Sequence, residues 1–193
     1  MKKEIHVLGL GPGIENYINI KNSELPKTIG VNDIWRYYQT DYVLCMDKLS
    51  EFTDERLDII TYCNPLKFYT CWPEWNFVRT LVGNHTLKIV LDNIIPGRGG
   101  LVESLDSDSV IPFHVDSTFT AACLAYRLIK NYPGEGKIIM FGCRFLGHIQ
   151  LQNFIPAIQE SYKRLYVALL ERGITLYNTD EESALYDVLP FYE

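Results

Sequence analysis

The stretch "HVLGLGPGIENY", residues 6–17, decides the fold, because it joins an apolar strand to a turn containing Gly9, Gly11, Pro12 and Gly13. A turn at the carboxyl end of the first strand lies where open parallel sheets bind their ligands. Glycine at such a turn lets backbone amides approach an anion without an intervening side chain. The stretch therefore predicts either a phosphate- or nucleotide-binding turn or a tight turn in a packed core. At this point both interpretations stay open.

The dinucleotide-binding fingerprint fits this turn only in part. Gly9 and Gly11 match its first two glycines, and Asp33 lies at a plausible distance for the acidic residue. Ile14 replaces the third glycine, and residues 14–27 read poorly as a helix because they contain several asparagines and a proline. We therefore expect a nucleotide or phosphate ligand rather than NAD(P).

Short apolar runs bounded by turn residues recur along the chain and are typical of strands buried on both faces. They predict strands over 4–9, 28–31, 41–46, 57–62, 86–91, 109–113, 137–142 and 174–177. Apolar residues at helical spacing predict helices over 118–130 and 149–171, with weaker ones at 33–40 and 73–82. Alternating strands and helices indicate an α/β, Rossmann-like domain spanning 1–193, a mostly parallel sheet with helices on both faces. The glycine-rich segment 92–108 is expected to be a mobile loop or lid.

Charge and composition narrow the classes of partner. The chain has 18 basic and 24 acidic residues and a net charge of −6, which argues against nucleic acid. Without a run of about 20 apolar residues, no membrane span is expected. The odd count of five cysteines fits reduced thiols in a cytoplasmic protein. The 13 tyrosines suit an aromatic-lined pocket or a homo-oligomer interface.

Polar side chains follow several of the predicted strands. Because the carboxyl ends of parallel strands meet at one edge of a sheet, these residues are candidates for binding a nucleotide. A strand-to-helix junction is also an anion site in its own right. Helix capping is the competing explanation for each residue alone. The residues are Asn32 and Asp33 after the second strand, Asp47 after the third, His114, Ser117 and Thr118 at a strand-to-helix junction, and Arg144 and His148 before the last helix.

Four stretches, in order, resemble the small Rossmann-like bacterial glycosyltransferases. They are "VLGLGPGIEN", "TIGVNDIW", "DSTFTAACLAYRLI" followed by "KIIMFGCRF", and "LLERGITLYNTDEESALYDVLPF". That group includes sialyltransferases that use a CMP-sugar. It also includes the flagellin-modifying (Maf-type) proteins related to the archaeal hydroxymethylpterin pyrophosphokinase.

The resemblance implies a nucleotide-sugar donor, with a CMP-sugar favoured, bound at the carboxyl edge of the sheet. By motif it assigns the donor nucleotide to the four residues of the glycine turn and to Asn32, with Ser117 and Thr118 as additions. This chain departs from the family at Gly13, where the family has serine, and it is shorter than full-length transferases. Both departures leave open a protein that binds a nucleotide without transferring a sugar.

Glycosyl transfer needs a base for the acceptor hydroxyl and groups that stabilise the departing phosphate. Among the histidines, His148 and His114 are the candidates for the base, and Arg144 could offset phosphate charge. No obligatory metal or cofactor is expected for a transferase; Mg²⁺ would be required only by a pyrophosphokinase-like enzyme. The alternatives are a non-catalytic nucleotide or signal-molecule binder and an interaction protein. The acceptor stays unassigned.

Overall fold

The computed structural model describes residues 3–18, 26–75, 84–86, 88–91, 104–114, 116–146 and 151–192. Its centre is a seven-stranded sheet with the strand order β5-β4-β3-β2-β1-β8-β9, in which every pair of neighbours is parallel. Two further strands, β6 and β7, pair as a small parallel sheet of their own. The strands are β1 (Glu4–Leu8), β2 (Lys27–Val31), β3 (Tyr42–Cys45), β4 (Lys67–Thr70), β5 (Asn84–Thr86), β6 (Lys88–Leu91), β7 (Val110–Phe113), β8 (Gly136–Phe141) and β9 (Ile174–Asn178).

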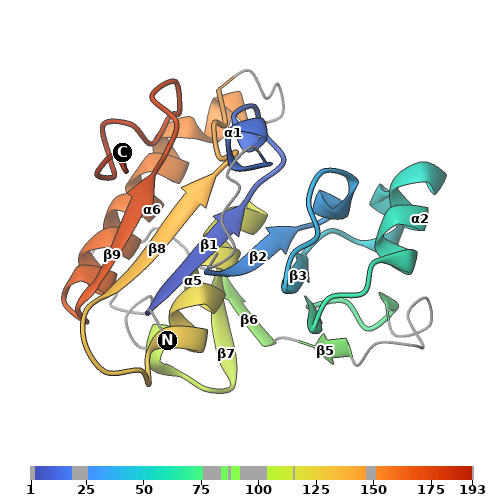
Figure 1. Ribbon diagram of the computed structural model, residues 1–193, viewed down its shortest axis with the longest axis horizontal. Helices are drawn as coiled ribbons and strands as arrows, with labels where there is room; N and C mark the ends of the chain where they lie inside the picture. Colours follow the sequence, from blue (N-terminus) through green and yellow to red (C-terminus); the bar gives the residue numbers. More distant parts are fainter. Residues whose placement is uncertain are drawn as a thin grey trace.

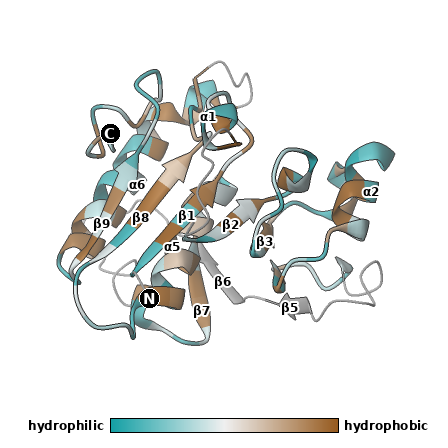
Figure 2. Ribbon diagram, in the orientation of Figure 1, coloured by the Kyte–Doolittle hydropathy of each residue, from teal (hydrophilic) through white to brown (hydrophobic). Residues whose placement is uncertain are grey.

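Helices pack on both faces of the main sheet (Figure 1). The long helices α5 (Ser117–Ile129) and α6 (Ile155–Leu170) lie on one face, where they share the largest hydrophobic core with alternate residues of the central strands. On the other face, α1 (Ile14–Ile18), the 3₁₀ turn η1 (Ile34–Arg36) and α2 (Asp54–Tyr62) cover two smaller cores. Figure 2 shows brown, apolar segments in the central strands β1 and β8, alongside hydrophilic residues near the starts of both strands. The predicted Rossmann-like α/β class is confirmed.

The strand order reverses beside β1. From β1 the chain builds outward through β2, β3 and β4 to β5, and it later returns to the other side of β1 as β8 and then β9. In open α/β sheets such a reversal leaves a crevice outside the carboxyl ends of the two central strands, and ligands bind there. The glycine turn follows β1, and residues 142–146 follow β8. The topology therefore places the turn at the switch point.

Several predicted elements differ from the structure. Residues 57–62 belong to helix α2 rather than to a strand, because Asp54 and Glu55 place negative charge at the positive end of a helix that Thr53 precedes. Strand β4 went unpredicted, since "KFYT" is short and has polar ends. The predicted strand 86–91 divides between β5 and β6, which belong to different sheets.

The helix predicted over 118–130 is found one residue earlier, as α5, and two of the other predicted helices have shorter bounds in the structure. The one expected over 149–171 starts as a 3₁₀ turn, η3 (Gln152–Phe154), before α6, and Gly173 after it adopts a φ of 70°. The helix expected over 33–40 reduces to η1. Residues 76–82 of the predicted helix 73–82 and residues 92–103 of the predicted lid lie outside the described residues, whereas 104–106 are helical. In the described part of the chain, no helix has the length and apolar character needed to cross a membrane.

Candidate functional site at the carboxyl edge of the sheet

The glycine turn packs backbone to backbone against the loop that follows β8. The Gly9 amide donates to the Phe141 carbonyl and the Gly11 amide to the Gly142 carbonyl, both at 2.8 Å. A Cβ added at Gly9 would lie 2.5 Å from the Gly142 carbonyl oxygen, and one at Gly11 would lie 2.7 Å from it. These two glycines are therefore needed for close approach of the two loops, and their amides already have acceptors within the protein.

The third glycine of the turn faces carboxylates. Gly13 has a φ of 90°, which favours glycine over the serine of the resembling family. Its amide donates to Oε2 of Glu15 at 3.1 Å, and a Cβ at Gly13 would lie 3.4 Å from Oδ2 of Asp180. Pro12 beside it is exposed. Within the structure, the amide predicted to bind a phosphate thus holds an anionic group of the same chain.

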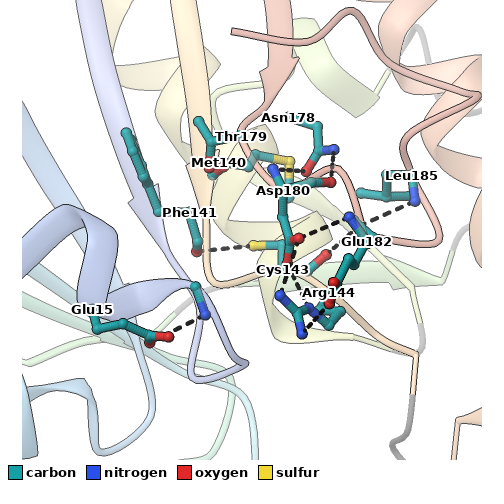
Figure 3. A network of polar contacts seen from close by, with 12 residues as sticks. Glu15, Met140, Phe141, Cys143, Arg144, Asn178, Thr179, Asp180, Glu182 and Leu185 are labelled. Atoms are coloured by element: carbon teal, nitrogen blue, oxygen red, sulfur yellow. Dashed lines mark hydrogen bonds and ion pairs between the residues drawn. The ribbon is translucent and has the colours of Figure 1, made fainter. Parts of the chain in front are cut away.

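Arg144 is paired with two carboxylates from the segment after β9 (Figure 3). Its Nε and Nη2 donate to the two carboxylate oxygens of Asp180, at 2.8 and 3.2 Å, and its Nη1 lies 2.7 Å from Oε2 of Glu182. These carboxylates raise the pKa of Arg144. The Ser183 hydroxyl donates to the Cys143 carbonyl at 2.7 Å, and the Ala184 amide donates to the Arg144 carbonyl at 3.0 Å. We call residues 179–184 the C-terminal strap, since they fasten the chain after β9 to the loop after β8.

The ends of β2 and β3 meet through Asn32 and Asp47. Asn32 adopts a left-handed conformation with a φ of 49°, and its Nδ2 donates to Oδ2 of Asp47 at 2.8 Å. Its amide donates to the Leu44 carbonyl at 2.9 Å. Burial, and next the charge of Glu51, raise the pKa of Asp47. Among the described residues, the buried Oδ1 of Asn32 has no hydrogen-bond partner.

Asp33, the residue after Asn32, forms ion pairs with two arginines. Its Oδ1 accepts from Nε and Nη2 of Arg56 at 2.9 and 2.7 Å, and its Oδ2 lies 3.7 Å from Arg36. The side chain is 6% exposed. Asp33 is thus held at the first turn of η1 by two arginines, which also fixes the backbone immediately after Asn32.

At the start of α5 the polar side chains form a buried network. Oδ1 of Asp116, the N-cap, accepts from the Phe119 amide at 2.7 Å, the Thr118 hydroxyl at 2.5 Å and the Tyr162 hydroxyl at 3.0 Å. Burial raises the pKa of both Asp116 and Tyr162. The hydroxyl of Thr118 therefore points into the protein, whereas Ser117 at the first helical position is only half-buried.

Of the two histidines proposed as the base, the structure describes only one. His114 is buried at the end of β7 and its ring packs against Phe119, with centroids 5.6 Å apart. His148 lies outside the described residues. In the part of the chain that the structure describes, no group of three or more His, Cys, Asp or Glu side chains could hold a metal ion.

Sequence reasoning missed the partners of these residues. Glu15, Arg56, Asp180 and Glu182 each pair with a predicted site residue or with its turn. The "TDEES" run after β9 concentrates acid next to a strand end, which was a signal for the strap. The pairing of Asp33 with Arg56 joins residues 23 positions apart and leaves no local signal.

Comparison with known proteins supports the fold class and goes no further. No protein-family model matches the chain, and no curated protein matches its sequence. Among solved structures, the alpha-2,3-sialyltransferase from Campylobacter jejuni, in its apo form, aligns with a TM-score of 0.55. The alignment covers 100% of this chain and 80% of that chain at 12% sequence identity. The protein is thus similar to a sialyltransferase in fold, and at this identity the likeness concerns the fold alone.

Proposed function

We propose that the protein is a glycosyltransferase-like enzyme that binds a nucleotide-sugar donor, of the CMP-sugar type, at the carboxyl edge of its sheet. The observation that carries this proposal is Asn32, a non-glycine residue in the left-handed region at the end of β2. Asparagine adopts this conformation at lower cost than other residues with a side chain, and residues in sparsely populated backbone conformations cluster at functional sites. The sialyltransferase-like fold supports the same class of donor.

The chemistry of Asn32 suits the hydroxyls of a ribose or an exocyclic amine. Its Nδ2 is fixed by Asp47, so Oδ1 keeps one orientation; Oδ1 is buried and unpartnered, and it accepts a hydrogen bond from the ligand once the ligand opens the edge around it. A buried acceptor without a partner costs free energy that a ligand donor recovers. Ser117 at the N-terminus of the 13-residue helix α5 lies at the same edge and suits the donor phosphate. Either His114 or His148 then takes the proton of the acceptor hydroxyl, and no obligatory metal is required.

The test uses Asn32→Gly. Glycine removes the side-chain acceptor and the Nδ2 bond to Asp47, but it relieves the positive φ, so the two effects on stability oppose each other and a thermal melt should show the variant folded, with an unfolding temperature within a few degrees of the native one. Its affinity for CMP, measured by calorimetry, should fall about tenfold, as expected for a lost buried hydrogen bond. A native protein that binds none of CMP, UMP and GMP would refute the proposed donor site. Unchanged CMP affinity in Asn32→Gly would remove Asn32 from it.

One observation favours a second candidate, a nucleotide-binding protein without transfer activity. Arg144, the arginine expected to offset the charge of a leaving phosphate, is already paired with two carboxylates. This candidate predicts CMP binding with neither hydrolysis nor transfer when the protein is incubated with CMP-N-acetylneuraminate and a panel of sugar acceptors. Product that persists in EDTA would support the metal-independent transferase. The pyrophosphokinase-like alternative predicts no product from the CMP-sugar, and instead a Mg²⁺-dependent transfer of pyrophosphate from ATP to an alcohol, with release of AMP.

A further inference from the structure

The two carboxylates on Arg144 are held very differently. Asp180 is 8% exposed and takes two hydrogen bonds from the guanidinium. Its carbonyl accepts from Nδ2 of Asn178 at 2.7 Å, and its Oδ1 accepts from the Glu182 amide at 2.9 Å. The Glu182 side chain is 75% exposed and reaches only Nη1. Asp180 is therefore a buried partner of Arg144, whereas Glu182 lies at the surface.

We propose that Arg144 binds the phosphate of the ligand through Nη1, with Asp180 as the residue that positions the guanidinium and Glu182 as an occupant that the phosphate replaces. The inference rests on the proposed nucleotide site and adds the group that receives its phosphate. No covalent step is involved, since one anion exchanges for another on the same nitrogen.

Exposure decides which carboxylate exchanges. An exposed ion pair contributes little to stability, because water and salt screen it and a long side chain must be ordered to make it. A buried carboxylate that loses its arginine would be left uncompensated, which is far more costly. A ligand phosphate therefore displaces Glu182 at small cost and leaves the Asp180 pair intact. With Nε and Nη2 fixed by Asp180, the direction of Nη1 is fixed as well.

The position of Arg144 beside the glycine turn supports this assignment. A Cβ at Gly11 would lie 3.4 Å from the Arg144 amide nitrogen, and a Cβ at Gly13 would lie 3.4 Å from Oδ2 of Asp180. Figure 3 shows Asp180 and Glu182 at the Arg144 guanidinium, with Glu15 to one side, bonded to the glycine turn. Because the amides of Gly9 and Gly11 are already bonded to the loop after β8, the positive charge at the switch point comes from Arg144 rather than from the backbone.

The test compares Glu182→Gln with Glu181→Gln, which removes the same charge from the neighbouring exposed residue of the strap. CMP, cytidine and free N-acetylneuraminate are each titrated into every variant and into the native protein by calorimetry at low salt. Glu182→Gln should bind CMP about two- to fivefold more tightly, the equivalent of an exposed ion pair that no longer has to be broken. Its affinity for cytidine, which has no phosphate, should stay unchanged, and the gain for CMP should shrink at high salt.

Three outcomes would overturn the inference. Equal CMP affinities in the two glutamine variants would show that Glu182 does not compete with the ligand. Tighter binding of cytidine to the same extent would show an effect unrelated to the phosphate. Tighter binding of free N-acetylneuraminate, with CMP unaffected, would move the exchange from a phosphate to a sugar carboxylate. If the native protein binds neither CMP nor cytidine, the proposed function itself fails, and that result is distinct from the other three.

The substitution Asp180→Asn is expected to change CMP affinity in the opposite direction. Loss of this charge releases the guanidinium from its fixed orientation, so CMP affinity should fall roughly fivefold or more while Glu182→Gln raises it. A thermal melt of the same sample establishes that the variant is folded. Two acids on one arginine that move ligand affinity in opposite directions are not expected of a purely structural ion pair. A rise in CMP affinity in Asp180→Asn would contradict its positioning role.

Discussion

Substituting Gly11 by alanine separates the two roles that a glycine turn can have. The added Cβ would lie 2.7 Å from the Gly142 carbonyl oxygen and 3.3 Å from its carbonyl carbon. Both contacts are with backbone atoms, and Gly142 itself lies against the carbonyl oxygens of the turn, so neither loop has a side chain that could move aside. The loops must separate by several tenths of an ångström, which breaks the bond from the Gly11 amide to the Gly142 carbonyl.

The expected loss combines overpacking with that broken hydrogen bond. Overpacking of a tight contact costs about 1–3 kcal/mol and a buried backbone hydrogen bond about 1 kcal/mol, so the free energy of unfolding should fall by about 2–4 kcal/mol. Urea denaturation at pH 7.5 measures it, provided that the slope m is unchanged. Gly134→Ala is the control, because its Cβ would meet no described atom within 4 Å and only its φ of 86° opposes alanine. That strain should cost about 1–2 kcal/mol.

A loss below about 1 kcal/mol in Gly11→Ala would refute the packing argument. It would show that the two loops can separate freely, and the requirement for glycine would then have to come from a ligand. In that case the affinity for CMP should fall sharply, while the free energy of unfolding stays unchanged. If packing is the reason, both quantities fall together.

Two further perturbations test the buried titratable groups. Asp116→Asn should be at least as stable as the native protein at pH 8, because it keeps an oxygen for the Phe119 amide and removes a buried charge. Burial raises the pKa of Asp116, so its charge opposes folding increasingly as pH rises above about 4; melts at pH 4 and 8 should show the advantage only at pH 8. A less stable variant at pH 8 would mean that the network needs the charge. Burial lowers the pKa of His6, so stability should fall as pH drops below about 6.5, and His6→Gln should flatten that slope in urea titrations. An unchanged slope would show that another group is responsible.

The sequence was sufficient for most of the sheet because its central strands consist mainly of buried apolar residues. In β1 and β8 the few polar residues, such as Glu4, His6 and Lys137, do not hide this signal, which is purely local. The prediction for 57–62 failed because "LDIITY" satisfies both periods, and the acidic residues that begin α2 lie before that window. Strand β4 depends on pairing with β3 to bury Phe68 and Tyr69, and four residues carry too little pattern to reveal it.

The site was predictable only at the level of its position. Strand ends predicted that Asn32 and Asp47 would come together, since topology alone brings carboxyl ends to one edge. The internal partners depend on contacts between distant segments. Arg144 meets Asp180 across 36 residues, and Thr118 meets Tyr162 across 44. The sequence therefore identifies candidate ligand-binding groups, but it does not show which of them are already paired with other residues of the chain.

The carboxyl edge therefore has two parts that suit different chemical groups of a ligand. Beside β2 and β3, Asn32 is oriented by Asp47 and offers a neutral acceptor, which suits a ribose or a base. Beside β1 and β8, the glycine amides are bonded within the fold, and charge is balanced through Arg144. A ligand with a neutral part and an anionic part would fit these two surroundings in only one direction. Reversing it would place its phosphate against Asp47 and near Arg56, whose Nε and Nη2 already donate to Asp33.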